Sequence, residues 1–174
     1  MGSVSVRKIT PKNLLIGSAS IHWWFPEFRK PRDYDIYAMD ESIIDKFRKN
    51  AGCCVKRRGS RYLVRIPGFL RIEVTINYPK SAIDDWVIAN QDSVIAEVAG
   101  VYLMVAKPTT MLLIKRIHSS CGAETTKKKK NQEDLIYLES RVHEKSSELE
   151  LVAYENRLRH IKNITKRGDN HGTA

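Results

Sequence analysis

Two aspartates, Asp33 and Asp35, stand two positions apart in a short segment that has the composition of a β-strand. Residues two apart on a strand point to the same face, so both carboxylates leave one side of this strand. Neighbouring carboxylates repel each other unless a cation lies between them, and such hard oxygen ligands suit Mg²⁺. The pair is therefore a candidate metal site, and the alternative is a solvated strand end.

The residues on either side of this pair predict the elements that must position it. Residues 14–39 have the pattern of a strand, a turn at Gly17 and Ser18, an aromatic helix, and then the strand that carries the aspartates. Further along, residues 62–78 alternate between apolar and polar side chains on both sides of a Pro-Gly turn, which predicts a β-hairpin.

A third carboxylate, Glu73, lies in the second arm of that hairpin, on its polar face. If this arm lies beside the strand that carries Asp33 and Asp35, the apolar faces of both strands must meet the same core. Glu73 must then share a face with the two aspartates. The alternative is that Glu73 pairs with Arg71 or Arg65 on an exposed surface.

The Leu-Ile-Gly-Ser segment at residues 15–18 and the Asp-Tyr-Asp-Ile segment at residues 33–36 resemble the signature of the polymerase-β-like nucleotidyltransferase superfamily. The resemblance implies that Gly17 and Ser18 open a helix whose unpaired backbone N–H groups bind a nucleoside triphosphate. It also implies a set of catalytic residues that hold Mg²⁺ or Mn²⁺, namely Asp33, Asp35 and Glu73.

A second segment, Val-Ala-Lys-Pro at residues 105–108, resembles one branch of this superfamily, the toxin nucleotidyltransferases of abortive-infection systems and related phage proteins. In that branch a helix bearing a lysine follows the strand end, and an aspartate begins another helix after a basic loop. The resemblance implies that Lys115 and Asp134 bind the triphosphate. The alternative for Lys115 is a lysine whose stem covers apolar neighbours. His118 lies on the same helical side, and we assign it no metal.

The chain has 174 residues and a formal net charge of +10, with a sequence pI near 9.6, which points to a polyanionic partner. Arg57, Arg58 and Arg61 lie in a stretch at residues 56–71 that has no acidic residue, and Lys128 lies in a second basic run. We expect these four side chains to contact the phosphates of a nucleic acid. An equally good account of the arginines is a charged edge strand that discourages aggregation.

The order of these patterns predicts an α+β fold, a nucleotidyltransferase-like mixed β-sheet flanked by helices, with C-terminal helices closing a cleft. We expect residues 1–106 to form the catalytic core and residues 107–165 to form a helical part, with a mobile basic loop at residues 119–131. Within the helical part, residues 147–150 have the sequence of a capping box. We expect residues 166–174 to be a disordered tail.

No segment resembles a secretory leader or a bilayer-spanning helix, so we expect no membrane partner. The three cysteines lack the spacing of a zinc site or a disulfide framework, which favours a reducing, cytoplasmic compartment.

The two resemblances together imply a metal-dependent enzyme that moves a nucleoside monophosphate from a triphosphate to a hydroxyl acceptor. The positive charge favours RNA as that acceptor, for example a tRNA-like 3′ end. One alternative is a basic nucleic-acid-binding module that kept the fold and lost turnover. Another is a metal nuclease of the PD-(D/E)xK kind, but that site wants a lysine where this chain has Thr75.

Overall fold

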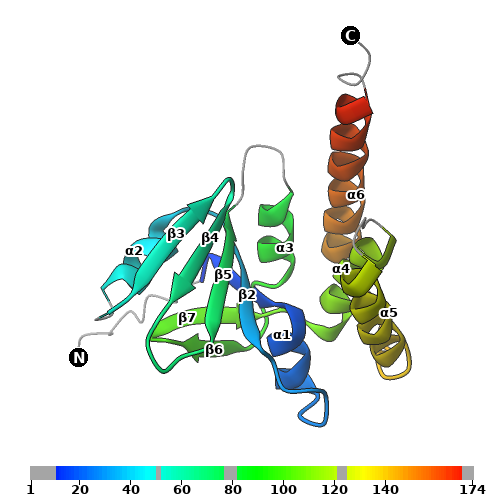
Figure 1. Ribbon diagram of the computed structural model, residues 1–174. Coiled ribbons are helices and arrows are strands. Elements are labelled where there is room, and N and C mark those ends of the chain that lie inside the picture. Colours follow the sequence, from blue (N-terminus) through cyan, green and yellow to red (C-terminus); the bar gives the residue numbers. More distant parts are fainter. Residues whose placement is uncertain (1–10, 50–51, 77–81, 121–124, 170–174) are drawn as a thin grey trace, which may run out of the picture.

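The computed structural model describes residues 11–49, 52–76, 82–120 and 125–169. These residues form one mixed sheet with helices on both of its faces (Figure 1). The strands are β1 (Asn13–Ile16), β2 (Asp33–Ala38), β3 (Cys54–Arg58), β4 (Arg61–Arg65), β5 (Arg71–Ile76), β6 (Ile95–Val98) and β7 (Val101–Val105). The helices are α1 (Gly17–Trp24), α2 (Ser42–Arg48), α3 (Ile83–Ala89), α4 (Pro108–Ser120), α5 (Thr125–Glu139) and α6 (Glu148–Asp169).

The strands follow the order β3-β4-β5-β2-β1-β7-β6 across the sheet. At its centre, β2 runs antiparallel to β1 and parallel to β5, and β1 runs parallel to β7. In the β2–β5 pair, Asp35 lies directly opposite Glu73. The hairpin arm that carries Glu73 therefore lies beside the strand that carries the aspartates, which is the condition under which Glu73 must share their face.

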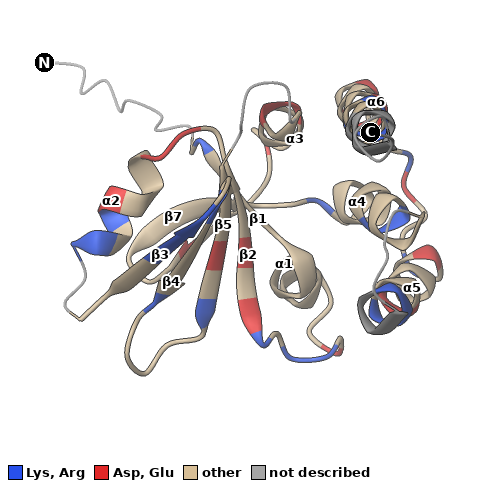
Figure 2. Cartoon of the chain, turned by 45° about the horizontal axis from the view of Figure 1, so that its top comes forward, with Lys and Arg blue, Asp and Glu red and all other residues tan. Residues whose placement is uncertain are grey.

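Alternation along the strands sorts the apolar side chains into two cores, one on each face of the sheet. One core contains Ile36 of β2 and Phe47 of α2. The other contains Leu14 of β1, Trp86 of α3 and Met111 of α4. Figure 2 shows the same division, with α2 on one side of the sheet and the remaining helices on the other. The predicted α+β class, a mixed sheet flanked by helices, is confirmed.

The C-terminal helices belong to the second of these cores. Leu138 of α5 and Ala153 of α6 are buried in the same cluster as Leu14 of the central strand β1. The predicted boundary at residue 106 falls between β7 and α4. It separates the sheet from the three C-terminal helices in sequence, but residues from both sides of it share one core. Figure 1 shows α6 standing beside α4 and extending past the sheet.

Two expectations about the C-terminal part are wrong. The lysine run at residues 127–130 lies within α5, not in a loop, because lysine has a high helix propensity and a run of lysines does not end a helix. Of the predicted loop, residues 121–124 lie outside the described residues. Helix α6 also continues to Asp169, so residues 166–169 are helical, and residues 170–174 of the predicted tail lie outside the described residues.

None of the helices in the described ranges combines the length and the apolar character needed to cross a bilayer. Cys53 and Cys54 are free thiols, whereas Cys121 lies outside the described ranges.

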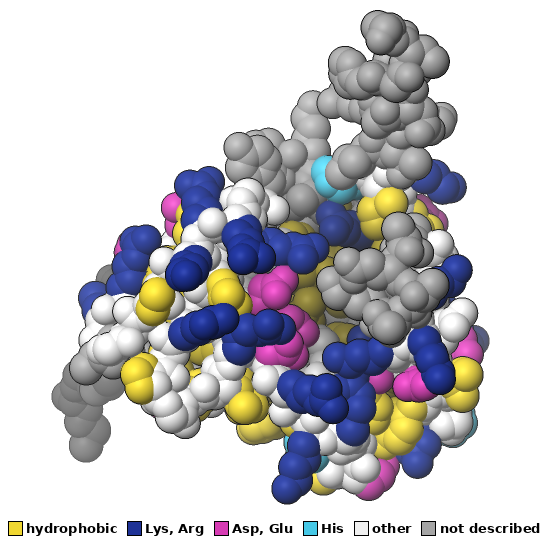
Figure 3. Space-filling view, in the orientation of Figure 1, with side chains coloured by type: hydrophobic (Ala, Val, Ile, Leu, Met, Phe, Trp, Pro, Cys, Tyr) yellow, Lys and Arg dark blue, Asp and Glu magenta, His cyan; other side chains and the backbone are white. Residues whose placement is uncertain are grey.

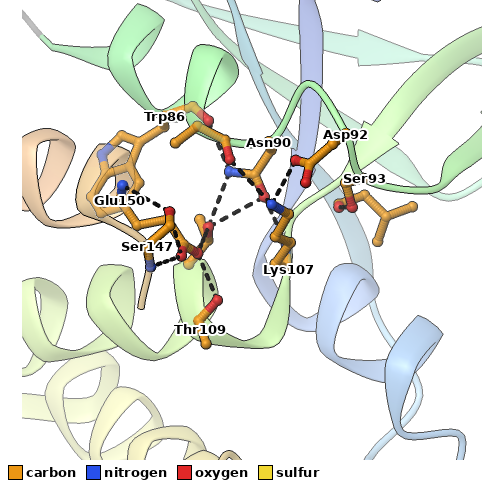
Figure 4. A network of polar contacts seen from close by, with 11 residues as sticks. Trp86, Asn90, Asp92, Ser93, Lys107, Thr109, Ser147 and Glu150 are labelled. Atoms are coloured by element: carbon orange, nitrogen blue, oxygen red, sulfur yellow. Dashed lines mark hydrogen bonds and ion pairs between the residues drawn. The ribbon is translucent and has the colours of Figure 1, made fainter. Parts of the chain in front are cut away.

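A buried glutamate, Glu150, ties the start of α6 to the start of α4 (Figure 4). It is 2% exposed, and its Oε1 accepts hydrogen bonds of 2.6 Å from the hydroxyls of both Thr109 and Thr110. Its Oε2 accepts a 2.7 Å bond from the Ser147 backbone N–H, while the Ser147 hydroxyl accepts one from the Glu150 backbone N–H. The predicted capping box is confirmed, and Asn90 of the α3 end joins the network through Thr110.

Replacement of Glu150 by alanine is expected to destabilise the fold by about 2–4 kcal/mol, because Thr109, Thr110 and Ser147 lose a shared acceptor in a buried place. Burial alone would raise the pKa of Glu150, but the hydrogen bonds from these three residues lower it on balance. A lowered pKa means that the contribution of the carboxylate to stability is present above its ordinary value of 4.5 and is lost at lower pH.

Urea denaturation of Glu150→Ala at pH 7 and pH 4 measures both effects. Glu148→Ala, at an exposed acid in the same helix turn, is the control and should change stability by about 0.5 kcal/mol or less. Equal effects of the two variants at pH 7 would contradict the assignment of the network.

Candidate functional site

The sequence begins α1 at Gly17, directly after the buried strand β1, and the backbone there needs a glycine. Gly17 has a φ of +72°, which side-chain-bearing residues rarely adopt. A Cβ atom added to Gly17 would lie 2.5 Å from Oδ2 of Asp35. The missing side chain therefore lets the start of the helix lie against a carboxylate of the next strand. Ser18 is buried beside it and is not among the residues that line the cavity described below.

Three carboxylates share the face of the sheet that α1 and α4 border. Asp33 and Asp35 alternate with Tyr34 on β2, and Glu73 lies opposite Asp35 on the neighbouring strand β5. Figure 2 shows the acidic positions on β2 and β5 side by side. In the space-filling view, acidic side chains gather in the middle of one face, and basic side chains surround them (Figure 3).

The environment of Asp35 favours the neutral form more than water does, so its pKa is higher than that of an exposed aspartate. Burial, and then the negative charges of Asp33 and Glu73, raise the pKa of Asp35 from 3.8 to about 6, against the smaller opposing effects of Lys115 and Lys130. Among the described residues, no cation or hydrogen-bond donor contacts the Asp35 carboxylate. Negative charge at the centre of the site is therefore only partly neutralised by the protein.

The two outer carboxylates each contact an arginine. Nη2 of Arg71 lies 2.6 Å from Oδ2 of Asp33, and Nη1 of Arg61 lies 3.3 Å from Oε1 of Glu73. In this arrangement no three metal-binding side chains of the described ranges converge closely enough to hold an ion. The donor atoms are nevertheless hard oxygens on one face, and the carboxylate of Asp35 contacts no counter-charge, so the chemistry of this donor set is that which Mg²⁺ prefers.

The opposite wall of the site is formed by α4 and α5. Nζ of Lys115 lies 2.7 Å from Oδ2 of Asp134 and 3.0 Å from Oδ1 of Asn131. Asp134 is 2% exposed and accepts further bonds from the guanidinium of Arg29 through both carboxylate oxygens. The structure thus places Asp134 behind Lys115 and outside the cavity, whereas the sequence suggested that both residues contact the triphosphate.

Burial lowers the pKa of Lys115, and the adjacent carboxylate of Asp134 opposes this effect. His118, one helical turn after Lys115, borders the same cavity. Burial, and then the positive charge of Lys115, lower the pKa of His118 to about 4, so this imidazole is neutral at pH 7.

A cavity of about 680 Å³ lies between the sheet and these helices. Gly17, the three carboxylates and Lys115 line it, as the sequence-based interpretation requires. Several further polar residues line it that the sequence analysis did not assign to the site, namely Arg71, Thr75, His118, Lys130, Asn131 and Arg157. For His118 the signal was its spacing of three from Lys115, whereas Arg157 approaches only through the packing of α6.

A family model described as a domain of unknown function, DUF7277, matches residues 13–155. The chain belongs to the DUF7277 family. No curated protein matches it. Among solved structures, this DUF7277 chain is similar to a crystal structure of an antigenic nucleotidyltransferase-like protein from Paracoccidioides brasiliensis, with a TM-score of 0.51 and 14% identity. The likeness covers 88% of this chain and 82% of that chain, and it supports a nucleotidyltransferase-like fold.

The basic residues of this DUF7277 chain divide between the two faces of the sheet. Arg58 lies opposite Arg61, which lines the cavity together with Lys128 of α5. Arg57 lies instead opposite Tyr62, with its guanidinium 5.5 Å from the centre of that ring. Tyr62 belongs to the core beneath α2. Of the three arginines that the sequence grouped together, Arg58 and Arg61 therefore share the carboxylate face, and Arg57 does not.

Proposed function

We propose that this chain is a metal-dependent nucleotidyltransferase, which moves a nucleoside monophosphate from a nucleoside triphosphate to a hydroxyl group. The observation that carries the proposal is the position of the carboxylates. Asp33, Asp35 and Glu73 lie on one face of two adjacent parallel strands, directly beside Gly17 at the start of a helix. The nucleotidyltransferase-like fold supports this interpretation, because the resemblance found in the sequence assigns metal and triphosphate binding to these same positions.

Each wall of the cavity has a separate task in this proposal. Gly17 allows a phosphate group to approach the backbone of the helix start, where N–H groups are unpaired. Lys115 presents a positive charge from the opposite wall, and Asp134 together with Asn131 holds its ammonium in place. Because Arg29 also pairs with Asp134, the carboxylate that positions Lys115 is itself fixed.

Asp33, Asp35 and Glu73 would hold the metal ions. When bound, Mg²⁺ lowers the pKa of the attacking hydroxyl and neutralises charge on the leaving pyrophosphate. In the transfer the acceptor hydroxyl would give up its proton to water, its oxygen would bond to the α-phosphorus, and the bond from that phosphorus to the bridging oxygen of pyrophosphate would break.

Incubation of the protein with each of the four α-³²P-labelled triphosphates, Mg²⁺ or Mn²⁺, and a mixture of cellular RNA and protein tests the proposal. Label in the RNA fraction is the expected result, and the labelled nucleotide identifies the donor. Label that appears equally with Asp35→Asn would reject the assigned site.

We propose RNA as the acceptor class, because basic side chains on the carboxylate face suit a phosphate backbone. Charge reversal of Arg58 to glutamate is expected to weaken RNA binding about 3- to 10-fold and to reduce the salt dependence of binding, since each phosphate contact adds to that dependence. The control is Arg57→Glu, which alters the same hairpin on its other face. Filter binding at 50 and 200 mM salt measures both effects. An equal loss of RNA affinity in Arg57→Glu would contradict a specific RNA-binding face and would favour the alternative, a charged edge strand that discourages aggregation.

The strand end at residues 105–108 and the pair of Lys115 and Asp134 also support a place among the toxin nucleotidyltransferases, with tRNA-like 3′ ends as acceptors. Growth arrest upon expression in cells, abolished by Asp35→Asn, is the expected sign of such a toxin.

A nucleic-acid-binding module of the same fold is the second candidate. The ion pairs of Asp33 with Arg71 and of Glu73 with Arg61 favour it, because they occupy two of the three carboxylates. Such a module would bind RNA with a salt-dependent affinity, would transfer no label from any triphosphate, and would lose nothing in Asp35→Asn.

A further inference from the structure

Two arginines occupy the outer carboxylates of the site. The pair of Asp33 and Arg71 follows from the register of the sheet, since these residues lie directly opposite each other on β2 and β5. Arg61 lies opposite Thr75 and reaches Glu73 diagonally along the strand. Both guanidiniums therefore lie on the carboxylate face and line the cavity.

These arginines can move without disturbing the core. The side chains of Arg71 and Arg61 are 49% and 64% exposed, whereas those of their partner carboxylates are largely covered. Each guanidinium ends a flexible stem, so the ion pair can open by rotation of the arginine while the strand stays in place. Exposed ion pairs of this kind contribute only about 0–1 kcal/mol to stability. Opening these two ion pairs therefore costs little free energy.

We propose that Arg71 and Arg61 are exchangeable counter-ions, which neutralise Asp33 and Glu73 before substrate enters and then bind the polyphosphate of the incoming metal–nucleoside triphosphate. The inference rests on the proposed function and adds two triphosphate-binding residues to it. A carboxylate oxygen that accepts a bond from a guanidinium is less available to a metal ion. The displaced guanidinium needs an anion, and its planar fork matches the oxygens of a phosphate.

The exchange makes the binding of metal and polyphosphate interdependent. Metal alone must displace the arginines from Asp33 and Glu73 and gives them no new partner. Metal and polyphosphate together give each group a partner of opposite charge. Removal of an arginine should therefore strengthen the binding of metal alone and weaken the binding of polyphosphate. Ion pairs that only support the sheet would change neither affinity, or would lower both.

The test uses the full chain and two probes. Mn²⁺ alone is titrated by electron paramagnetic resonance, and inorganic tripolyphosphate with saturating Mg²⁺ is titrated by calorimetry. Arg71→Gln and Arg61→Gln are each expected to raise Mn²⁺ affinity about 3- to 10-fold and to lower tripolyphosphate affinity about 10-fold. Arg57→Gln, on the opposite face of the hairpin, is the matched control and should leave both affinities within about twofold of the wild type.

Unchanged or lower Mn²⁺ affinity in both glutamine variants, or unchanged tripolyphosphate affinity, would overturn the exchange while leaving a nucleotidyltransferase intact. If the wild-type protein binds neither Mn²⁺ nor tripolyphosphate, the proposed function is wrong, and the proposed exchange is wrong as well. If Arg71→Gln does not fold, Arg71→Lys tests the proposal instead, because lysine keeps the positive charge but lacks the planar guanidinium that matches phosphate oxygens. Its Mn²⁺ affinity should equal that of the wild type while its tripolyphosphate affinity falls, and a wild-type value for both would overturn the proposal.

Discussion

Asp35→Asn is expected to abolish nucleotidyl transfer and, in the absence of metal, to make the protein more stable at pH 7.5. The folded protein raises the pKa of Asp35 from 3.8 to about 6, chiefly through burial and also through Asp33 and Glu73. A carboxyl whose pKa is raised by folding stabilises the fold while it is protonated, so stability is lost as pH rises from about 4 through 6. The difference corresponds to at most about 3 kcal/mol above that range.

Urea denaturation in EDTA between pH 4 and pH 7.5 tests the stability part, and α-³²P transfer tests the activity part. The two proteins should have equal stability near pH 4, and the variant should be the more stable above pH 6. Asp33→Asn is the matched control, because it removes the partner of Arg71 and should bring no such gain. A stability difference between wild type and Asp35→Asn that does not change with pH would contradict the buried, unneutralised carboxylate.

Lys115→Ala is expected to lower kcat about 10²–10³-fold, the effect of removing one preorganised electrostatic group. The ammonium of Lys115 is held by Asp134 and Asn131 at the cavity wall, where charge develops on the leaving pyrophosphate in the proposed reaction. The fold should survive, since Arg29 still pairs with the buried carboxylate of Asp134. Lys115→Arg should recover little, because a guanidinium does not fit a place shaped for an ammonium.

Single-turnover kinetics at saturating triphosphate separate this effect from acceptor binding, and RNA affinity should stay nearly unchanged. Lys107→Ala is the control. Lys107 lies just before α4, its ammonium pairs with the exposed Asp92, and it does not line the cavity. Full turnover by Lys115→Ala would remove the role of Lys115 and, with it, the positioning role proposed for Asp134.

The part of the site that the sequence could predict is the part governed by strand periodicity. The period of two placed Asp33 and Asp35 on one face, and the demand for a common apolar core placed Glu73 with them. The same rule could have separated Arg57 from Arg58, because adjacent residues on a strand always point to opposite faces. Grouping them by charge alone overlooked that signal.

The rest depends on packing between elements distant in sequence. Asp134 is one of many polar residues on α5, and only the packing of this helix against α4 turns it toward Lys115. The pairing of Arg61 with Glu73 depends on the register of β4 against β5, and the approach of Arg157 depends on α6. The alternative interpretation of Glu73 paired it with Arg71 or Arg65, whereas the register places Arg71 opposite Asp33.

The close approach of Gly17 to Asp35 has a consequence for comparing members of the DUF7277 family. Every codon change that replaces this glycine by another amino acid adds a Cβ atom, which would meet Oδ2 of Asp35 at 2.5 Å. A single missense mutation at Gly17 would therefore displace the carboxylate of Asp35 while Asp33, Asp35 and Glu73 all remain in the sequence. Under the proposed function, a homologue that has all three acids but a different residue at position 17 is expected to transfer no nucleotide, so the three acids alone do not identify an active member.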